Sequence, residues 1–166
     1  MSADNVARSV SPEIIAIEES LTELAHIATR ARQHERLMAV AALTLDRAAA
    51  ATLRQLADCE PARIGELAGR LAVEASHVTR QVQALEKAGY VARTVDPEDG
   101  RAQLIQLTAL GRGAVERIRT ASRYGVQLAL AQWPAEDVKD LAVLFRRMVD
   151  DFVAHAEDEI GFRFPG

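Results

Sequence analysis

Several features that define other classes of protein are scarce or missing in this chain. It holds a single cysteine among 166 residues, so no disulfide can form within one chain. No apolar run approaches the roughly 20 residues that span a bilayer, and the first ten residues lack the apolar stretch of a secretory signal. We therefore expect a cytoplasmic protein with a reduced thiol and no membrane partner.

Signatures of enzymes and cofactor sites are also missing. There is no Gly-rich phosphate loop, no nucleophile elbow and no metal-binding box. Cys59 lies between Asp58 and Glu60, and carboxylates beside a thiol raise its pKa and lower its reactivity. We expect no enzyme activity, no cofactor and no redox sensing, and we expect no metal site because the histidines lack the spacing of metal ligands: His26, His34, His77 and His155.

A basic excess is absent as well, since the net charge is −4. The charges are unevenly spread, however. Residues 63–101 hold six basic and six acidic side chains, whereas residues 135–160 hold eight acidic and three basic ones. Attraction to phosphate depends on the local surface more than on the total, so the net charge does not exclude a nucleic-acid partner for the central segment.

The chain does contain a pattern typical of a helix-turn-helix. We expect a short helix from Ile64 to Leu71, a turn at residues 72–74 and a second helix from Ala75 to Ala88, which Gly89 ends. The spacing of Ala68, Ala72 and Val78 supplies the small residue, the turn residue and the buried branched residue that this motif requires. Gly is more common in the turn because a positive φ is favoured there, and Ala72 is expected to adopt it at modest strain.

A polar hairpin follows these helices at once. Strand-like residues 91–95 and 102–107 flank Asp96-Pro97-Glu98-Asp99-Gly100, which has strong turn chemistry. This order of elements predicts a winged helix-turn-helix, in which the second helix enters the major groove of DNA and the hairpin, or wing, reaches the next minor groove.

The second helix has one apolar and one polar side. At 100° per residue, Val78, Val82 and Leu85 face the short helix. The opposite side is nearly free of acids, which distinguishes it from an ordinary solvated face. We predict that it contacts DNA, with Arg80 and Gln83 suited to base edges, Lys87 and Thr79 to phosphates, and the remaining members near the helix start: Ser76 and His77.

The wing supplies further candidates. Arg101 follows the turn, and a lone Arg gains from the negative potential of a narrow minor groove. Asp99 is expected to pair with Arg101 or Arg93 and hold the tip in shape. Arg93, on the first strand, is a second candidate phosphate contact. An ordinary hairpin with a weak surface ion pair is the alternative.

Helices with apolar stripes are predicted on both sides of this module. Ser11, Pro12 and Glu13 start a helix that we expect to run to about Arg36. Its apolar residues recur at spacings of three and four and form one stripe: Ile14, Ile17, Leu21, Leu24, Ala25 and Ala28. A further helix covers residues 44–57, and after the hairpin Thr108 caps a helix to about residue 131. Trp133-Pro134 separates it from a last helix to about residue 157, with one apolar side: Val138, Leu141, Leu144, Phe145, Met148, Val149 and Phe152.

The terminal stripes are what a dimer interface needs, and a symmetric dimer presents two second helices about one DNA turn apart. A monomer that buries these stripes on itself is the alternative. We expect a mainly α fold with a small hairpin wing, organised as an N-terminal dimerisation helix (1–36), a DNA-binding domain (37–108) and C-terminal dimerisation helices (109–166) in one intertwined domain.

The residues resemble the MarR family of bacterial transcription regulators. The resemblance covers roughly residues 14–155 and rests on six stretches, of which the wing is the most specific: Leu45–Arg47, Arg63–Ala68, Val78–Val82, Leu85–Val91, Asp96–Ala102 and Leu107–Arg112. It implies a homodimeric repressor of a palindromic operator on double-stranded DNA. It also implies release by a small effector, often aromatic or phenolic, bound between the dimer helices and the DNA-binding domain.

The resemblance is uneven at single positions. Asp99 and Arg101 match the family's wing pair, and Thr79 and Arg80 match its DNA-reading helix. Ala72 replaces the usual Gly, and Glu74 stands where Ser or Asp often caps the helix, so that a negative charge lies near phosphates. No effector residues carry over. His26 and Arg30, one turn apart, could meet an anionic effector, although a solvated dimer helix is the alternative. A winged module that binds protein instead of DNA also stays open.

Overall fold

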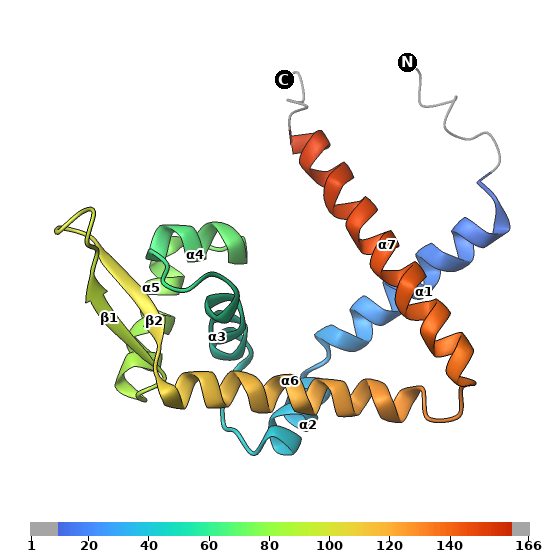
Figure 1. Cartoon of the computed structure of the whole chain (residues 1–166), viewed down its shortest axis with the longest axis horizontal. Coiled ribbons are helices and arrows are strands. Elements are labelled where there is room, and N and C mark those ends of the chain that lie inside the picture. Colours follow the sequence, from blue (N-terminus) through green and yellow to red (C-terminus); the bar gives the residue numbers. More distant parts are fainter. Residues whose placement is uncertain (1–9, 161–166) are drawn as a thin grey trace. The chain divides into compact units, whose positions relative to one another are not determined.

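The computed structural model describes the fold of residues 10–160 and the side chains of residues 10–155. The chain divides between residues 122 and 123 into two compact units, each of which is described by itself. The elements in chain order are α1 (Pro12–Thr29), α2 (Ala31–Ala41), α3 (Arg47–Cys59), α4 (Ile64–Leu71), α5 (Ala75–Lys87), β1 (Val91–Val95), β2 (Gln103–Leu107), α6 (Ala109–Ala129) and α7 (Ala135–Ile160) (Figure 1). This mainly α fold with one hairpin confirms the predicted fold class.

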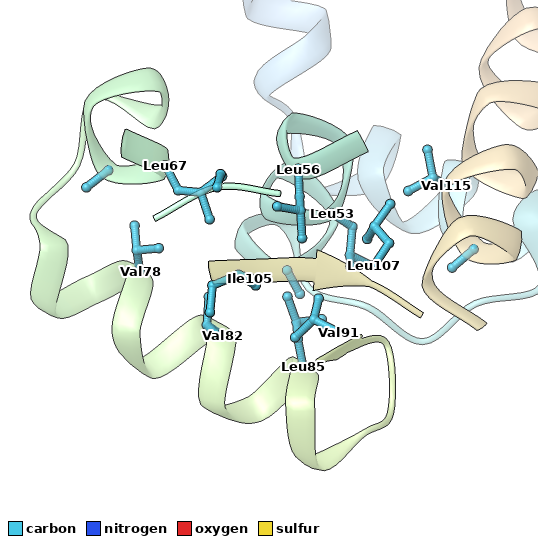
Figure 2. Packing of buried hydrophobic residues seen from close by; sticks show 14 residues of the cluster. Leu53, Leu56, Leu67, Val78, Val82, Leu85, Val91, Ile105, Leu107 and Val115 are labelled. Atoms are coloured by element: carbon cyan, nitrogen blue, oxygen red, sulfur yellow. The ribbon is translucent and has the colours of Figure 1, made fainter. Parts of the chain in front are cut away.

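The main core lies between α3, α4, α5, the hairpin and the start of α6. Figure 2 shows that large aliphatic side chains from all of these elements form one cluster. Leu53 and Leu56 of α3, Leu67 of α4, Val82 of α5 and Ile105 of β2 have no exposed surface. Their burial in one cluster supplies the apolar area that holds these short elements together.

The bounds of α4 and α5 agree closely with the prediction. Ala72, between them, has φ 51° and Gly89, after α5, has φ 79°, so both residues adopt the expected left-handed conformation. The N–H of Ala72 donates to the carbonyl of Gly69, and the N–H of Gly89 to that of Glu86. Glu74 occupies the N-cap of α5 without a side-chain cap, as expected for a residue other than Ser or Asp.

The hairpin is an antiparallel pair in which Val91 lies opposite Leu107 and Val95 opposite Gln103. Its base gains a third backbone partner. Ala62 pairs with Ile105 through two hydrogen bonds of 3.0 and 2.8 Å, so the segment before α4 is tied to β2. A two-stranded hairpin alone is marginal in water, and this bridge together with the core fixes its base.

Thr108 caps α6 as predicted. Its Oγ1 accepts the N–H of Gly111 at 3.1 Å and donates to the carbonyl of Gly89 at 2.6 Å. A Cβ at Gly111 would lie 2.0 Å from the carbonyl oxygen of Tyr90. Only a glycine therefore permits the close approach of α6 to the chain that leaves α5.

The prediction of one N-terminal helix to about Arg36 was wrong. The chain leaves the helical region at Arg30 (φ −66°, ψ 134°), which ends α1 and begins α2. The guanidinium of Arg47 donates to the freed carbonyl of Arg30 at 3.1 Å. A partner 17 residues away thus satisfies the break, and no local signal indicated it. Ser11 stands at the N-cap of α1 but makes no side-chain cap bond.

The helix predicted from Thr44 begins later, at Arg47, because Asp46 caps it. Asp46 Oδ1 accepts the N–H of Ala49 at 2.7 Å, which satisfies one of the free donors at the helix start. Ala49, Leu53 and Leu56 are buried as expected, and Leu45 packs on the same cluster.

Helix α1 and the described part of α7 bury none of their residues within a single chain. In α1 the exposed apolar side chains include Ile14, Ile17 and Leu24. In α7 they include Leu144 and Phe152. These are members of the predicted apolar stripes. No helix within residues 10–160 combines the length and apolar character needed to cross a bilayer.

Candidate nucleic-acid interface

Helices α3, α4 and α5 and the hairpin, residues 47–107, together form a unit that we call the reading head. Its core turns one side of α5 inward, since Val78, Val82 and Leu85 point from α5 toward the cluster in Figure 2. The predicted contact residues on the other side are exposed to solvent: Ser76, His77, Arg80, Gln83 and Lys87. The structure therefore brings this candidate set onto one face of one helix.

Two of the candidates on α5 have local partners. A guanidinium nitrogen of Arg80 lies 3.2 Å from Nδ1 of His77, one helical turn earlier. Thr79 is half-buried, and its hydroxyl donates to the carbonyl of Ala75 at 2.8 Å. The hydroxyl oxygen of Thr79 can still accept a hydrogen bond, but its proton is used within the helix.

The tip of the wing is held by backbone contacts. Asp99 Oδ1 accepts the backbone N–H of Arg101 at 3.1 Å, and the N–H of Ala102 donates to the carbonyl of Asp99 at 2.8 Å. The predicted ion pair of Asp99 with Arg101 or Arg93 is not what the structure shows. Within residues 10–155 the guanidinium of Arg101 makes no ion pair or hydrogen bond, so the exposed side chain is available to a ligand.

Arg93 has other partners than the one expected. Its Nε donates to Glu86 of α5 at 2.9 Å, and a terminal nitrogen donates to Gln103 of β2 at 3.1 Å. The side chain is only 22% exposed. Arg93 therefore links α5 to both strands of the wing, and its role as a phosphate contact stays a prediction.

An ion pair that sequence reasoning missed joins the wing to the start of α4. Asp96 Oδ2 accepts from Nε of Arg63 at 2.9 Å and from a terminal nitrogen at 2.5 Å. The backbone N–H of Glu98 and the Arg63 guanidinium together hold the pKa of Asp96 below its usual range. Asp96 in turn raises the pKa of Arg63. The partners are 33 residues apart, so spacing offered no signal.

The acidic segment at the end of α3, residues 58–60, is a structural junction. Asp58 pairs with Arg119 of α6 at 2.9 Å, and Glu60 pairs with Arg112 of α6 at 2.5 Å. Burial raises the pKa of the Cys59 thiol, with Glu66 and Asp58 acting in the same direction. A raised pKa keeps the thiol protonated near neutral pH, and burial contributes more to this shift than the carboxylates that the sequence pointed to.

Other candidate ligand positions stay untested. His26 lies in the last turn of α1, and Arg30 forms the break after it. In the same unit, a hollow of about 420 Å³ borders α2 and the loop before α3, and His34, Met38 and Leu45 are among its lining residues. His34 is engaged there, since its Nε2 lies 2.8 Å from the carbonyl of Leu45. No group of three or more potential metal ligands occurs in the part of the chain that the structure describes.

Comparison with known proteins agrees with this geometry. The family model described as the MarR family matches residues 45–102, which covers α3, α4, α5, β1 and the tip of the hairpin but ends just before β2. The uncharacterised helix-turn-helix transcriptional regulator YxaD of Bacillus subtilis is 31% identical over 109 residues, which is 66% of this chain and 76% of that protein.

Solved structures show the same fold. A MarR family protein from Bacillus stearothermophilus has a TM-score of 0.74 at 19% identity, covering 87% of this chain and 99% of its own. The PcaV transcriptional regulator from Streptomyces coelicolor, solved with its natural ligand, has a TM-score of 0.51 at 24% identity, covering 76% and 91%.

Proposed function

Because the chain belongs to the MarR family of transcription regulators, we propose that two copies bind a palindromic operator and that a small effector releases them. Regulation of transcription through DNA binding is the function of this family and of the helix-turn-helix relative. The symmetric operator, the repressor role and the effector go beyond that function and are part of the proposal.

The observation that carries DNA reading is the exposed face of α5. It offers Arg80, whose fork matches guanine, and Gln83, which matches adenine, with Lys87 near the helix end for phosphate. The pairing of Arg93 with Glu86 neutralises the acid that flanks this face and connects α5 to the wing. The exposed Arg101 then suits the minor groove.

A binding titration with a salt series tests this proposal. The probe is the labelled duplex upstream of the chain's own gene, with a scrambled duplex as the control. A DNA reader loses affinity steeply as salt rises, with a log–log slope of about 0.9 per phosphate contact. Indifference to every duplex at low salt would favour the other reading, a winged module that binds protein.

The apolar faces of α1 and α7 support a homodimer. They leave Ile14, Ile17 and Leu24 of α1 exposed, and on α7 Leu144, Met148 and Phe152 border a hollow of about 510 Å³. Contiguous exposed apolar surface of this kind marks an interface. A second copy is the partner that places two α5 helices about 34 Å apart, one turn of DNA. Light scattering of the purified chain measures the dimer directly.

The proposed effector is a small aromatic or phenolic compound, an anionic one if His26 and Arg30 contact it. The likeness to PcaV, solved with its natural ligand, supports a ligand-responsive regulator. Calorimetric titration with a panel of aromatic carboxylates, followed by the same titration on His26→Ala and Arg30→Ala, tests both points. A bound compound must also weaken operator binding, since an effector shifts the equilibrium by its differential affinity for the free and DNA-bound states.

The family and the relatives are regulators and not enzymes, so we propose no catalytic activity. A regulator of transcription acts where the chromosome lies, and the proposed location is accordingly the cytoplasm.

A further inference from the structure

We propose that the Arg63–Asp96 pair is a brace that sets the angle of the wing against α4 and thereby positions Arg101 for the minor groove. This inference rests on the proposed role of Arg101 in DNA binding. The two residues would act as positioning residues, since neither needs to touch DNA for the brace to matter.

The Arg63 end of the brace is anchored on the reading head. Arg63 is the residue before α4, and its carbonyl accepts the N–H of Leu67 at 3.0 Å. Its neighbour Ala62 is fully buried and makes both backbone bonds to Ile105. The backbone of Arg63 is therefore fixed on both sides, while its side chain reaches out to the wing.

The Asp96 end of the brace lies where β1 has left the core. Thr94 and Val95 are exposed, Val95 by 65%, yet Asp96 immediately after them is 6% exposed. Apolar packing thus does not hold the distal half of the wing, by which we mean the hairpin from Thr94 through the tip to Leu104. Arg63 binds Oδ2 of Asp96 through two N–H groups, and hydrogen bonds between two charged groups are the strong ones.

A continuous set of hydrogen bonds leads from this pair to the tip. Asp96 Oδ1 accepts the N–H of Glu98 at 2.9 Å, and the backbone N–H of Asp96 donates to the carbonyl of Ala102 at 3.0 Å. Ala102 follows Arg101, whose own N–H is bound by Asp99. A change at Asp96 therefore displaces the segment that presents Arg101.

The brace complements the contacts of the proximal half. There the core residues Val91 and Ile105 and the Arg93–Glu86 pair hold the strands against α5. If the Arg63–Asp96 pair is lost, the proximal half keeps its contacts with the core and α5. The distal half becomes a two-stranded ribbon that can move relative to α4. The fold should survive this loss, whereas the position of Arg101 should not.

The test is a set of operator titrations on the whole chain of 166 residues, with circular dichroism and light scattering to verify fold and assembly. Asp96→Asn gives the sharpest result. It removes a negative charge near phosphates, so electrostatics alone predicts tighter binding. The brace predicts weaker binding. Glu98→Gln is the matched control, because it removes a charge from the same turn at an exposed side chain outside the brace, and it should bind as well as or better than wild type.

A double-mutant cycle separates positioning from direct contact. Arg101→Ala should weaken operator binding, and Arg63→Gln should cause a large part of the same loss of affinity. The double variant should bind no more weakly than Arg101→Ala alone. Arg63→Lys, which keeps the charge but not the fork, should recover part of the loss. Arg119→Gln, which breaks the ion pair between α6 and Asp58, should leave operator binding unchanged.

Each outcome decides the matter. Tighter or unchanged binding by a folded Asp96→Asn overturns the brace. Losses from Arg63→Gln and Arg101→Ala that add in full overturn it too, since Arg63 would then contact DNA independently. If Arg101→Ala weakens operator binding and Arg63→Gln does not, the brace is overturned and the proposed role of Arg101 stands. A silent Arg101→Ala overturns the proposed wing role and the brace with it.

Discussion

In the reading head the large aliphatic side chains point inward, and Leu53, Leu56, Leu67 and Ile105 have no exposed surface. In α1 and the described part of α7, side chains of the same kind are exposed, among them Ile14 by 55%, Leu144 by 63% and Phe152 by 60%. One region completes its apolar contacts within a single chain and the other does not. The difference supports the proposal that the reading head folds by itself, whereas α1 and α7 need a second copy of the chain to cover their apolar side chains.

The largest effect is expected from a charge on the apolar stripe of α7, which tests whether this stripe is needed for assembly. Phe152→Asp should separate the proposed dimer and leave the reading head folded. Operator affinity should fall by about 100-fold or more, because two linked half-site contacts become one. Light scattering and an operator titration measure the two effects. Val143→Asp, on the opposite side of α7 and 63% exposed, is the matched control and should stay dimeric.

The opposite change removes a buried side chain from the reading head. Leu53→Ala leaves a cavity among fully buried neighbours and should lower the free energy of unfolding by about 2–5 kcal/mol. Urea unfolding followed by circular dichroism measures this loss. Val40→Ala, at a 58% exposed position of α2, should change stability far less. Equal losses from the two variants would contradict the arrangement of the core.

A third variant sharpens the contrast by changing only the surface of the reading head. Arg80→Ala should cost about 1–3 kcal/mol of operator binding and relax the preference at one base pair. Assembly and unfolding should not change, because the side chain is exposed. Titration against a series of operators with single base changes measures the preference. An equal loss on all of them would make Arg80 a phosphate contact only.

The smallest expected effect is a pH dependence of the reading head. Since the folded pKa of Asp96 is lowered, the carboxylate contributes stability that is complete above its unfolded pKa, near 4. That contribution is lost as pH falls through the lower folded pKa. The difference in unfolding free energy between wild type and Asp96→Asn should therefore shrink below about pH 4. A difference that stays constant down to strong acid would contradict the shifted pKa.

Much of the reading head was predictable because its signals are local. The bounds of α4, the turn at Ala72, the end of α5 at Gly89 and the cap at Thr108 all depend on residues within a few positions of one another. Helical periodicity likewise placed Val78, Val82 and Leu85 in the core. Backbone preference and side-chain spacing determine such features before any tertiary contact forms.

Two of the features that were missed depend on distant partners. Arg47 satisfies the freed carbonyl at the break, 17 residues earlier, and Arg63 pairs with Asp96 of the wing, 33 residues later. Arg93 pairs with Glu86 of α5 instead of Asp99, although the two acids are about equally far from it along the chain. Each of these arginines could reach several acceptors, and the sequence offers no rule for choosing among them. Candidate contacts on α5 needed no such choice, because one helix face presents them all.

The sequence by itself therefore determined the order of elements from α4 to the hairpin, the buried face of α5 and the chemistry of the side chains opposite it. Periodicity and turn preference act over a few residues, so their effects can be predicted from the sequence. Only the tertiary structure decided which charged groups meet, where the first helix breaks and what holds the distal wing. Those outcomes depend on distances between segments that packing alone brings together.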